Sequence, residues 1–224
     1  MPRQLAAEGQ IPRQRRDQNG IHVGRRPPPS WVADQLAKGT SVLIARLLNE
    51  HSKLRSLGAE MATLVANAEP CDLAELARCR WNVARSLHLH LAYEERHLFS
   101  RYETDPRPEV RLASAKARRR VDQLHALYKV HVERWNGKAI AAGWPHYQLA
   151  IRSMIARFIA MMDQEEAELF PLVAEDGESY LSWRPGMKNW AGEAVALQPH
   201  ITGAAAAAWE QNSPRTAFSK HPSA

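Results

Sequence analysis

The chain of 224 residues contains little cysteine and no long apolar run. Its two cysteines, Cys71 and Cys79, lie eight residues apart, which argues against a disulfide framework or a thiolate zinc site and indicates reduced thiols. No apolar stretch reaches the roughly 18 residues that a membrane-spanning helix needs. The polar, arginine-rich N-terminus lacks the apolar block of a secretory signal. We therefore expect a cytoplasmic protein that does not bind a membrane.

Several sequence signals of enzymes and of β-structure are also missing. No stretch shows the sustained alternation of apolar and polar residues that is typical of a β-strand. No glycine-rich phosphate loop, nucleotide-binding fingerprint or nucleophile–base pair is found. The sequence therefore selects no reaction, and it favours a binding protein over an enzyme.

Apolar residues recur at three- and four-residue steps in four segments, which is the pattern of amphipathic helices. Asp72 is a plausible N-cap for the second segment, and Pro145 suits the start of the fourth. Prolines at 106 and 108 and the pair Asn136-Gly137 predict breaks between helices. Four long helices with short connections predict an all-α fold, an antiparallel up-down-up-down four-helix bundle. The expected helices are residues 34–68, 72–102, 109–135 and 145–173.

The composition divides the chain into three parts. Residues 1–35 hold a proline run and many arginines, and we expect them to be a disordered basic tail. Residues 36–176 form the bundle, and residues 177–224 form an irregular C-terminal extension. Within that extension the alanine run 204–208 favours a short helix. Three tryptophans could pack the extension against the bundle: Trp183, Trp190 and Trp209.

Positive charge is concentrated in the N-terminal tail. The net charge is +6 and the pI about 9.6, and six arginines precede Ser30 against two acids, Glu8 and Asp17. Such a tail can bind an acidic protein or a nucleic acid through phosphate contacts. No base-reading motif accompanies the charge, so a solvated tail is the simpler interpretation.

A half-repeated motif is the strongest functional signal. Residues 90–100 read HLAYEERHLFS and residues 161–171 read MMDQEEAELFP, so both copies share Glu-Glu, two variable residues and Leu-Phe. In the first copy His90 precedes Glu94 by four residues, which places both on one face of a helix. An imidazole and a carboxylate on one face can bind the same metal ion. A further histidine lies upstream of each copy, His51 and His125, so the chain reads as two similar helix pairs.

The order of these residues resembles the hemerythrin-like (HHE cation-binding) family over residues 36–175. That resemblance implies a four-helix bundle with a non-haem di-iron centre between the helices. It also implies roles in binding oxygen, in sensing oxygen or nitric oxide, or in handling iron. Carried over residue by residue, it implies five metal ligands, with Glu165 as an alternative to the last: His51, His90, Glu94, His125 and Glu166.

Two positions depart from the family pattern. The third helix often has a second histidine where this chain has Lys129, and the fourth should have histidine where it has Met161. An ammonium group cannot bind a metal, and a thioether suits soft metals better than iron. We therefore expect one well-held metal ion, or a weakened second one, with iron, manganese or zinc as the candidates.

Two alternatives remain open at this point. Lys129 could pair with Glu94 or Glu166 inside the bundle and replace the metal, leaving a metal-free bundle that acts on partners through its basic tail. The pair Glu94 and His97 also matches the Glu-x-x-His motif of ferritin-like di-iron bundles. The fourth helix, however, has Glu168 where that motif needs histidine.

Overall fold

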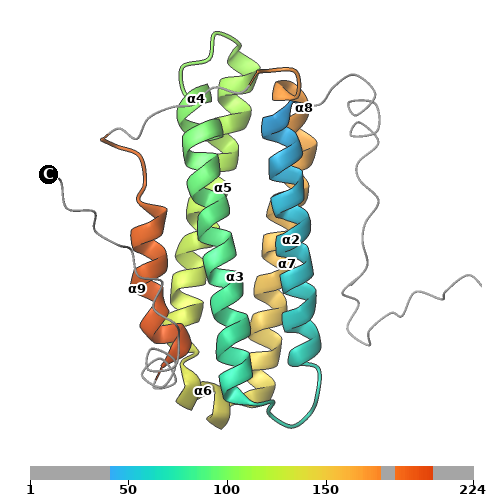
Figure 1. Ribbon diagram of the computed structural model, residues 1–224, viewed down its shortest axis with the longest axis vertical. Helices are drawn as coiled ribbons and strands as arrows, with labels where there is room; N and C mark the ends of the chain where they lie inside the picture. Colours follow the sequence, from blue (N-terminus) through green and yellow to red (C-terminus); the bar gives the residue numbers. More distant parts are fainter. Residues whose placement is uncertain (1–40, 178–184, 204–224) are drawn as a thin grey trace, which may run out of the picture.

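A computed structural model describes residues 41–177 and 185–203 of the chain. Four long helices run alternately up and down in an antiparallel bundle (Figure 1). The described residues form no strand, so the expected all-α bundle is confirmed. None of the described helices is long and apolar enough to cross a membrane. The four helices are α2 (Val42–Leu64), α3 (Leu73–Glu94), α5 (Pro108–Arg134) and α7 (Trp144–Glu168).

The helix ends follow from local sequence. The Asp72 side chain accepts a hydrogen bond from the backbone N–H of Ala74 at 2.8 Å, so it caps α3 as predicted. Proline occupies the first turn of both α5 and α7, where its missing N–H costs nothing. The break expected near Asn136 contains a short helix, α6 (Gly137–Ala142), which Asn136 caps. After α7, the chain continues as α8 (Phe170–Val173).

The second long helix reaches Tyr102 as predicted, although it is not uniform. A π-helical turn, η1 (Glu95–Phe99), follows α3 directly, and α4 (Ser100–Tyr102) follows η1. Single π-turns within α-helices are rare and are found frequently at functional sites. This turn begins immediately after Glu94, in the first copy of the motif.

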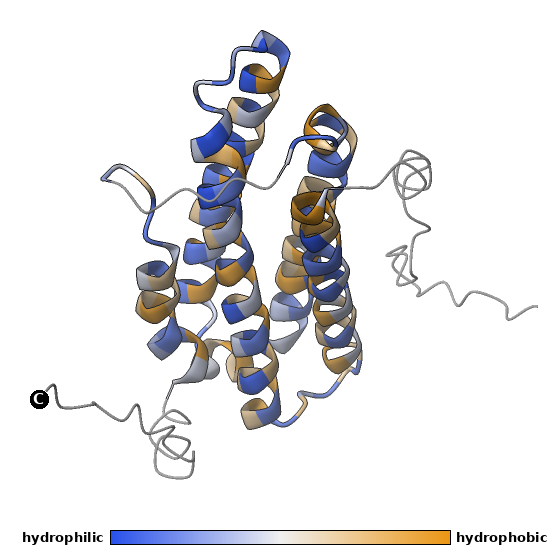
Figure 2. Cartoon of the chain, turned by 45° about the horizontal axis from the view of Figure 1, so that its top comes forward, coloured by the Kyte–Doolittle hydropathy of each residue, from blue (hydrophilic) through white to orange (hydrophobic). Residues whose placement is uncertain are grey.

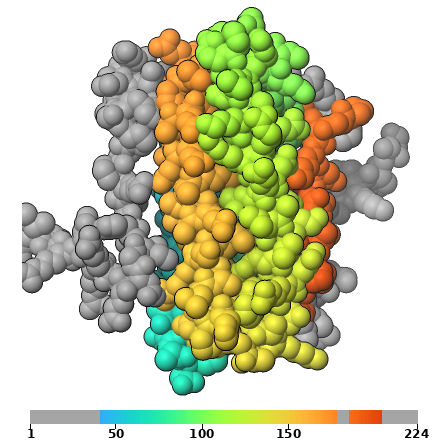
Figure 3. Space-filling view, turned by 180° about the vertical axis from the view of Figure 1, so that it is seen from behind, coloured from blue at the N-terminus to red at the C-terminus, as the bar shows by residue number. Residues whose placement is uncertain are grey.

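The C-terminal extension is not wholly irregular, contrary to the expectation for residues 177–224. Residues Trp190–Thr202 form helix α9, whose first turn is capped by the Asn189 side chain at the N–H of Gly192. The helix forms because its apolar residues Trp190, Leu197 and Ile201 are buried, each about 2% exposed. It packs against α3 and α5, and Figure 3 shows it along the edge of α5 on the side away from α7.

Trp190 packs the extension against the bundle, which the sequence had left open. Trp183, Trp209, the alanine run 204–208 and the basic tail 1–35 lie outside the described residues.

The hydrophobic core runs along the inside of the bundle. Figure 2 shows apolar residues on the inner faces of the helices and polar residues on the outer faces. Buried residues of α2, α3, α5, α7 and α9 form the larger part of this core, and Met161 belongs to it at 5% exposed. A tightly packed core fixes side-chain positions, so polar groups placed within it are held in defined geometry.

Candidate metal centre

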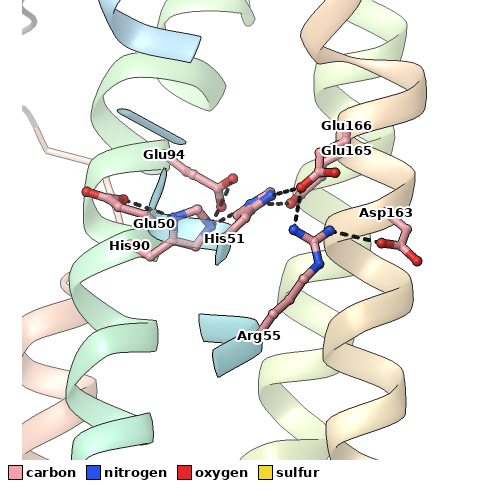
Figure 4. Close-up of polar contacts among 8 residues, drawn as sticks. All are labelled: Glu50, His51, Arg55, His90, Glu94, Asp163, Glu165 and Glu166. Carbon is pink, nitrogen blue, oxygen red and sulfur yellow. Dashed lines mark hydrogen bonds and ion pairs between the residues drawn. The ribbon is translucent and has the colours of Figure 1, made fainter. Parts of the chain in front are cut away.

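A cluster of two histidines and two glutamates lies inside the bundle. His51 comes from α2, His90 and Glu94 from α3, and Glu165 from α7 (Figure 4). One potential ligand atom from each residue lies within 4.8 Å of the others. All four side chains are buried, none more than 1% exposed. Residues far apart in sequence thus bring four metal-binding groups to one point.

Carboxylates outside this cluster orient both imidazole rings. Nδ1 of His51 lies 2.8 Å from Oε1 of Glu166, and Nδ1 of His90 lies 3.1 Å from Oε2 of Glu50. A carboxylate can only accept, so each Nδ1 carries the proton and donates it. This leaves each Nε2 facing the interior of the cluster. Histidines that bind metals in proteins have this arrangement, with a carboxylate or carbonyl behind the ring.

The two imidazole nitrogens face each other closely. Nε2 of His51 lies 3.1 Å from Nε2 of His90. When both Nδ1 atoms are protonated, two lone pairs meet at this distance unless a cation or a proton lies between them. Two nitrogens bound at about 2.1 Å to one metal, at right angles, would be about 3.0 Å apart. The observed separation therefore fits two neighbouring ligands of one ion.

The two glutamates of the cluster lack hydrogen-bond partners. All four carboxylate oxygens of Glu94 and Glu165 are buried and accept no hydrogen bond. Their nearest polar neighbours are the histidines, with Nε2 of His90 3.3 Å from Glu94 and Nε2 of His51 3.5 Å from Glu165. Burial and the adjacent charge of Glu94 raise the pKa of Glu165 well above its usual value. Buried carboxylates of this kind are normally paired or bound to a metal.

The surrounding carboxylates are held in their ionised form. Burial would raise the pKa of Glu166, but hydrogen bonds with His51 and Arg55 outweigh it and lower that pKa. Arg55 donates to Glu166 at 2.7 Å and to Asp163 at 2.9 Å, which fixes the glutamate behind the ring. Burial would also raise the pKa of Glu50 behind the His90 ring, but hydrogen bonds with His90 and Arg46 outweigh it and lower that pKa. Both rings therefore have an anionic acceptor.

The histidines differ in their affinity for a proton when no metal is bound. Burial lowers the pKa of His51. Burial opposes the charged form of His90 too, but the charge of Glu94 and the hydrogen bond to Glu50 raise its pKa to about 10. A proton on His90 therefore occupies the place of a cation in the metal-free cluster, and a metal ion has to displace it.

The π-turn separates the two consecutive glutamates of the first motif copy. Glu94 points into the cluster, whereas Glu95 pairs with Arg118 at 2.7 Å and accepts a hydrogen bond from Ser100 at 3.3 Å. The first glutamate of the pair thus serves the candidate centre, and the second connects η1 to α5.

The same rule applies to the second motif copy, where the sequence prediction chose the other glutamate. Glu165 joins the cluster, and Glu166 lies behind His51 as its hydrogen-bond acceptor. The sequence contained the signal for this choice. Aligned without gaps, Glu165 matches Glu94, and it follows Met161 by the same four-residue step that separates Glu94 from His90.

His125, another of the five predicted ligands, lies in a different cluster. Its Nε2 is 3.1 Å from Nε2 of His88, and its ring contacts Trp190 of α9 with centroids 4.9 Å apart. His88 donates from Nδ1 to the carbonyl of Ala84 at 2.7 Å. Burial, with the charge of Lys188, lowers the pKa of His125 to about 4, so the ring is neutral. Helix α9 covers the face of α5 that carries His125.

The two residue pairings that the alternatives invoked are not among the contacts of the described residues. Lys129 pairs with Glu193 of α9 at 3.0 Å, so the alternative pairing with Glu94 or Glu166 is wrong. The histidine that shares the cluster with Glu94 is His90. The His97 ring instead contacts the Tyr93 ring, with centroids 4.2 Å apart. The ferritin-like pair of Glu94 and His97 therefore does not form the cluster.

A comparison with protein families identifies the fold. The family model described as the hemerythrin HHE cation binding domain matches residues 42–173, which is more than half of the chain. The matched range covers α2 to α8 and includes all four residues of the cluster. Comparisons with curated proteins and with solved structures find no match. The chain therefore belongs to the hemerythrin HHE cation-binding family.

Proposed function

We propose that this protein binds one non-haem iron ion through His51, His90, Glu94 and Glu165. One observation carries the proposal: two buried glutamates without hydrogen bonds face the Nε2 atoms of two histidines whose Nδ1 atoms are held by other carboxylates. Two imidazoles and two carboxylates suit Fe(II), and also Mn(II) or Zn(II). The resemblance to hemerythrin-like proteins, which hold non-haem iron, favours iron among these.

The ligand set supports one ion rather than the two of a di-iron centre. A second ion next to Glu94 and Glu165 would need further donors from α5 and α7. Met161, one turn before Glu165, offers only a thioether, which is a poor ligand for iron. His125 and Lys129 make their contacts with α9 and its neighbours instead. The cluster is therefore proposed as a single-metal version of the family's site.

The role that fits this site best is reversible binding or sensing of a small diatomic ligand, or the storage of iron. A bound ferrous ion would supply affinity for oxygen or nitric oxide. The protein residues exclude water and hold the ligands rigid: Phe170 stacks on the His51 ring with centroids 5.4 Å apart, and Arg55 fixes Glu166. We favour a binding role over catalysis, and we expect the protein to act in the cytoplasm.

Paired histidine variants test the proposal. The metal content of His90→Ala and His125→Ala is measured by elemental analysis after anaerobic loading with Fe(II) and removal of unbound ion. Both substitutions remove a buried imidazole, but only His90 lies in the cluster. We expect His90→Ala to lose most of its iron and His125→Ala to keep the wild-type content. Equal metal content in the two variants would exclude the assigned site.

A second candidate function is a metal-free bundle that acts on a partner. One observation favours it: a proton shared between His51 and His90 closes a continuous hydrogen-bonded chain from Glu50 through both rings to Glu166 and Arg55 (Figure 4). The basic N-terminal segment would then bind an acidic protein or nucleic acid. This version predicts little bound iron after loading, together with DNA binding that weakens steeply as salt rises. Stoichiometric iron without DNA binding at low salt would exclude it.

A further inference from the structure

A buried arginine without a counter-charge lies in the lower half of the bundle. Arg80 of α3 is 5% exposed, and its Nη2 has no hydrogen-bond partner. Its Nη1 donates to the carbonyl of Ile201, near the end of α9, across a long 3.5 Å. No carboxylate of the described residues pairs with it. A guanidinium is always charged, so a buried one normally has an anionic partner.

Two other polar groups near Arg80 also lack partners. Nε2 of His131 on α5 and the hydroxyl of Tyr147 on α7 are buried, and neither has a hydrogen-bond partner. The guanidinium lies 5.9 Å from the Tyr147 ring centroid, and the Tyr147 and His131 rings are 6.2 Å apart. Burial, with the charge of Arg80, lowers the pKa of His131 to about 4, so its ring is neutral. Three helices thus bring polar groups without hydrogen-bond partners together, and Nε2 of His131 can donate when it carries the ring proton.

A small cavity adjoins these groups. Its volume is about 30 Å³, and Arg80 and His131 line it together with apolar or aromatic residues that include Met61, Tyr128 and Phe158. A water molecule needs about 10–15 Å³ of such space, so the cavity has room for one or two water molecules or for one monatomic anion.

We propose that this cavity binds a small monovalent anion with the size and chemistry of chloride. The anion accepts hydrogen bonds from Nη2 of Arg80 and Nε2 of His131 and neutralises the guanidinium. Water alone would satisfy the hydrogen bonds but not the charge, and an unpaired buried charge is strongly destabilising. Arg80 precedes His90 by ten residues on α3, which corresponds to about 15 Å along the helix. The anion site is therefore separate from the candidate metal centre and does not depend on it.

Bromide locates the site directly, because it replaces chloride and scatters anomalously. Wild-type crystals soaked in bromide are expected to show an anomalous peak in the cavity beside Arg80. The peak should persist in protein treated with a chelator, which separates this site from any anion bound to a metal ion. Bromide peaks confined to the surface, or only to the candidate metal centre, would overturn the proposal. This part of the test needs no variant.

Variants test the same site in solution. Urea unfolding is measured at increasing bromide, with total ionic strength held constant by gluconate, a bulky polyhydroxy carboxylate. Once bromide exceeds its dissociation constant, each tenfold increase should raise the folding equilibrium constant about tenfold in wild type. Arg80→Met should abolish this dependence, and His131→Phe should weaken it. Arg78→Met, which removes an exposed arginine from the same helix, should keep the wild-type dependence. The same bromide dependence in Arg80→Met and Arg78→Met would refute the assignment.

Discussion

Replacing Glu165 with glutamine should make the metal-free protein more stable and the metal-loaded protein less stable. Without metal, the carboxylates of Glu165 and Glu94 lie in one buried cluster, and their oxygens accept no hydrogen bond. An unsatisfied buried polar group costs about 1–3 kcal/mol, and more when it is charged. The raised pKa of Glu165 means that its carboxyl has to take up a proton on folding, which costs free energy at neutral pH. The glutamine amide is neutral without that proton and can donate to Glu94, so we expect a gain of about 1–3 kcal/mol in the free energy of unfolding.

The sign of the effect reverses when metal is present. An ion at a free concentration of 100 times its dissociation constant stabilises the folded wild type by about 2.7 kcal/mol. The Glu165→Gln variant loses an anionic ligand and with it most of this stabilisation. The Glu165→Gln variant should therefore be more stable than the wild type in chelator and less stable than the wild type in excess Fe(II).

Urea unfolding followed by circular dichroism, with chelator and with anaerobic Fe(II), measures both effects. Glu168→Gln is the matched control on the same helix. The Glu168 side chain is 39% exposed and pairs with Lys116 and Arg120, so its loss should cost less than about 1 kcal/mol in either condition. A Glu165→Gln protein that is less stable than wild type in chelator would show that the carboxylate is satisfied without metal. The reasoning would then be refuted.

Three further predictions follow from the same contacts. Met161→His should raise the iron content above one ion per chain, because it restores an imidazole one turn before the cluster; unchanged content by elemental analysis would contradict this placement. Glu166→Gln should weaken metal binding by about 10–100-fold in a competition titration without abolishing it, because Glu166 orients a ligand and does not face the ion. Burial lowers the pKa of His88, and it lowers those of His125 and His131 to about 4. These three rings therefore contribute stability that is lost as the pH falls from about 6.5 towards 4, since the unfolded state takes up protons first. His90, with its pKa raised to about 10, contributes in the opposite direction, and its share is lost as the pH rises above about 6.5. The urea midpoint in chelator should therefore fall on either side of about pH 6.5, and a flat midpoint between about pH 6.5 and 4 would contradict the first part.

The sequence predicted the long helices well because their signals are local. Apolar periodicity, the Asp72 cap and the prolines at 108 and 145 depend on neighbouring residues, and the observed ends of the three helices after Asp72 lie close to those expected. Helix α9 was missed for the opposite reason. Its stability depends on burying Trp190, Leu197 and Ile201 against α3 and α5, and no local pattern reveals that surface.

The candidate centre was predicted in part, and the errors have physical causes. His51, His90 and Glu94 come together because helix periodicity and the repeat place them on facing sides of α2 and α3. The choice between Glu165 and Glu166 depends on a rotation of about 100° around the helix, which the gapless alignment of the repeat already indicated. The surroundings of His125 could not be predicted from helix periodicity or the repeat, because they are formed by α9, which covers the face of α5 that carries His125.

Anomalous diffraction at the iron absorption edge, on crystals of the Fe(II)-loaded protein, tests the central claim most directly. We expect one strong iron peak per chain, between Nε2 of His51, Nε2 of His90 and the carboxylates of Glu94 and Glu165. No peak at that position, or an iron peak beside His88 and His125 instead, would contradict the proposed metal centre.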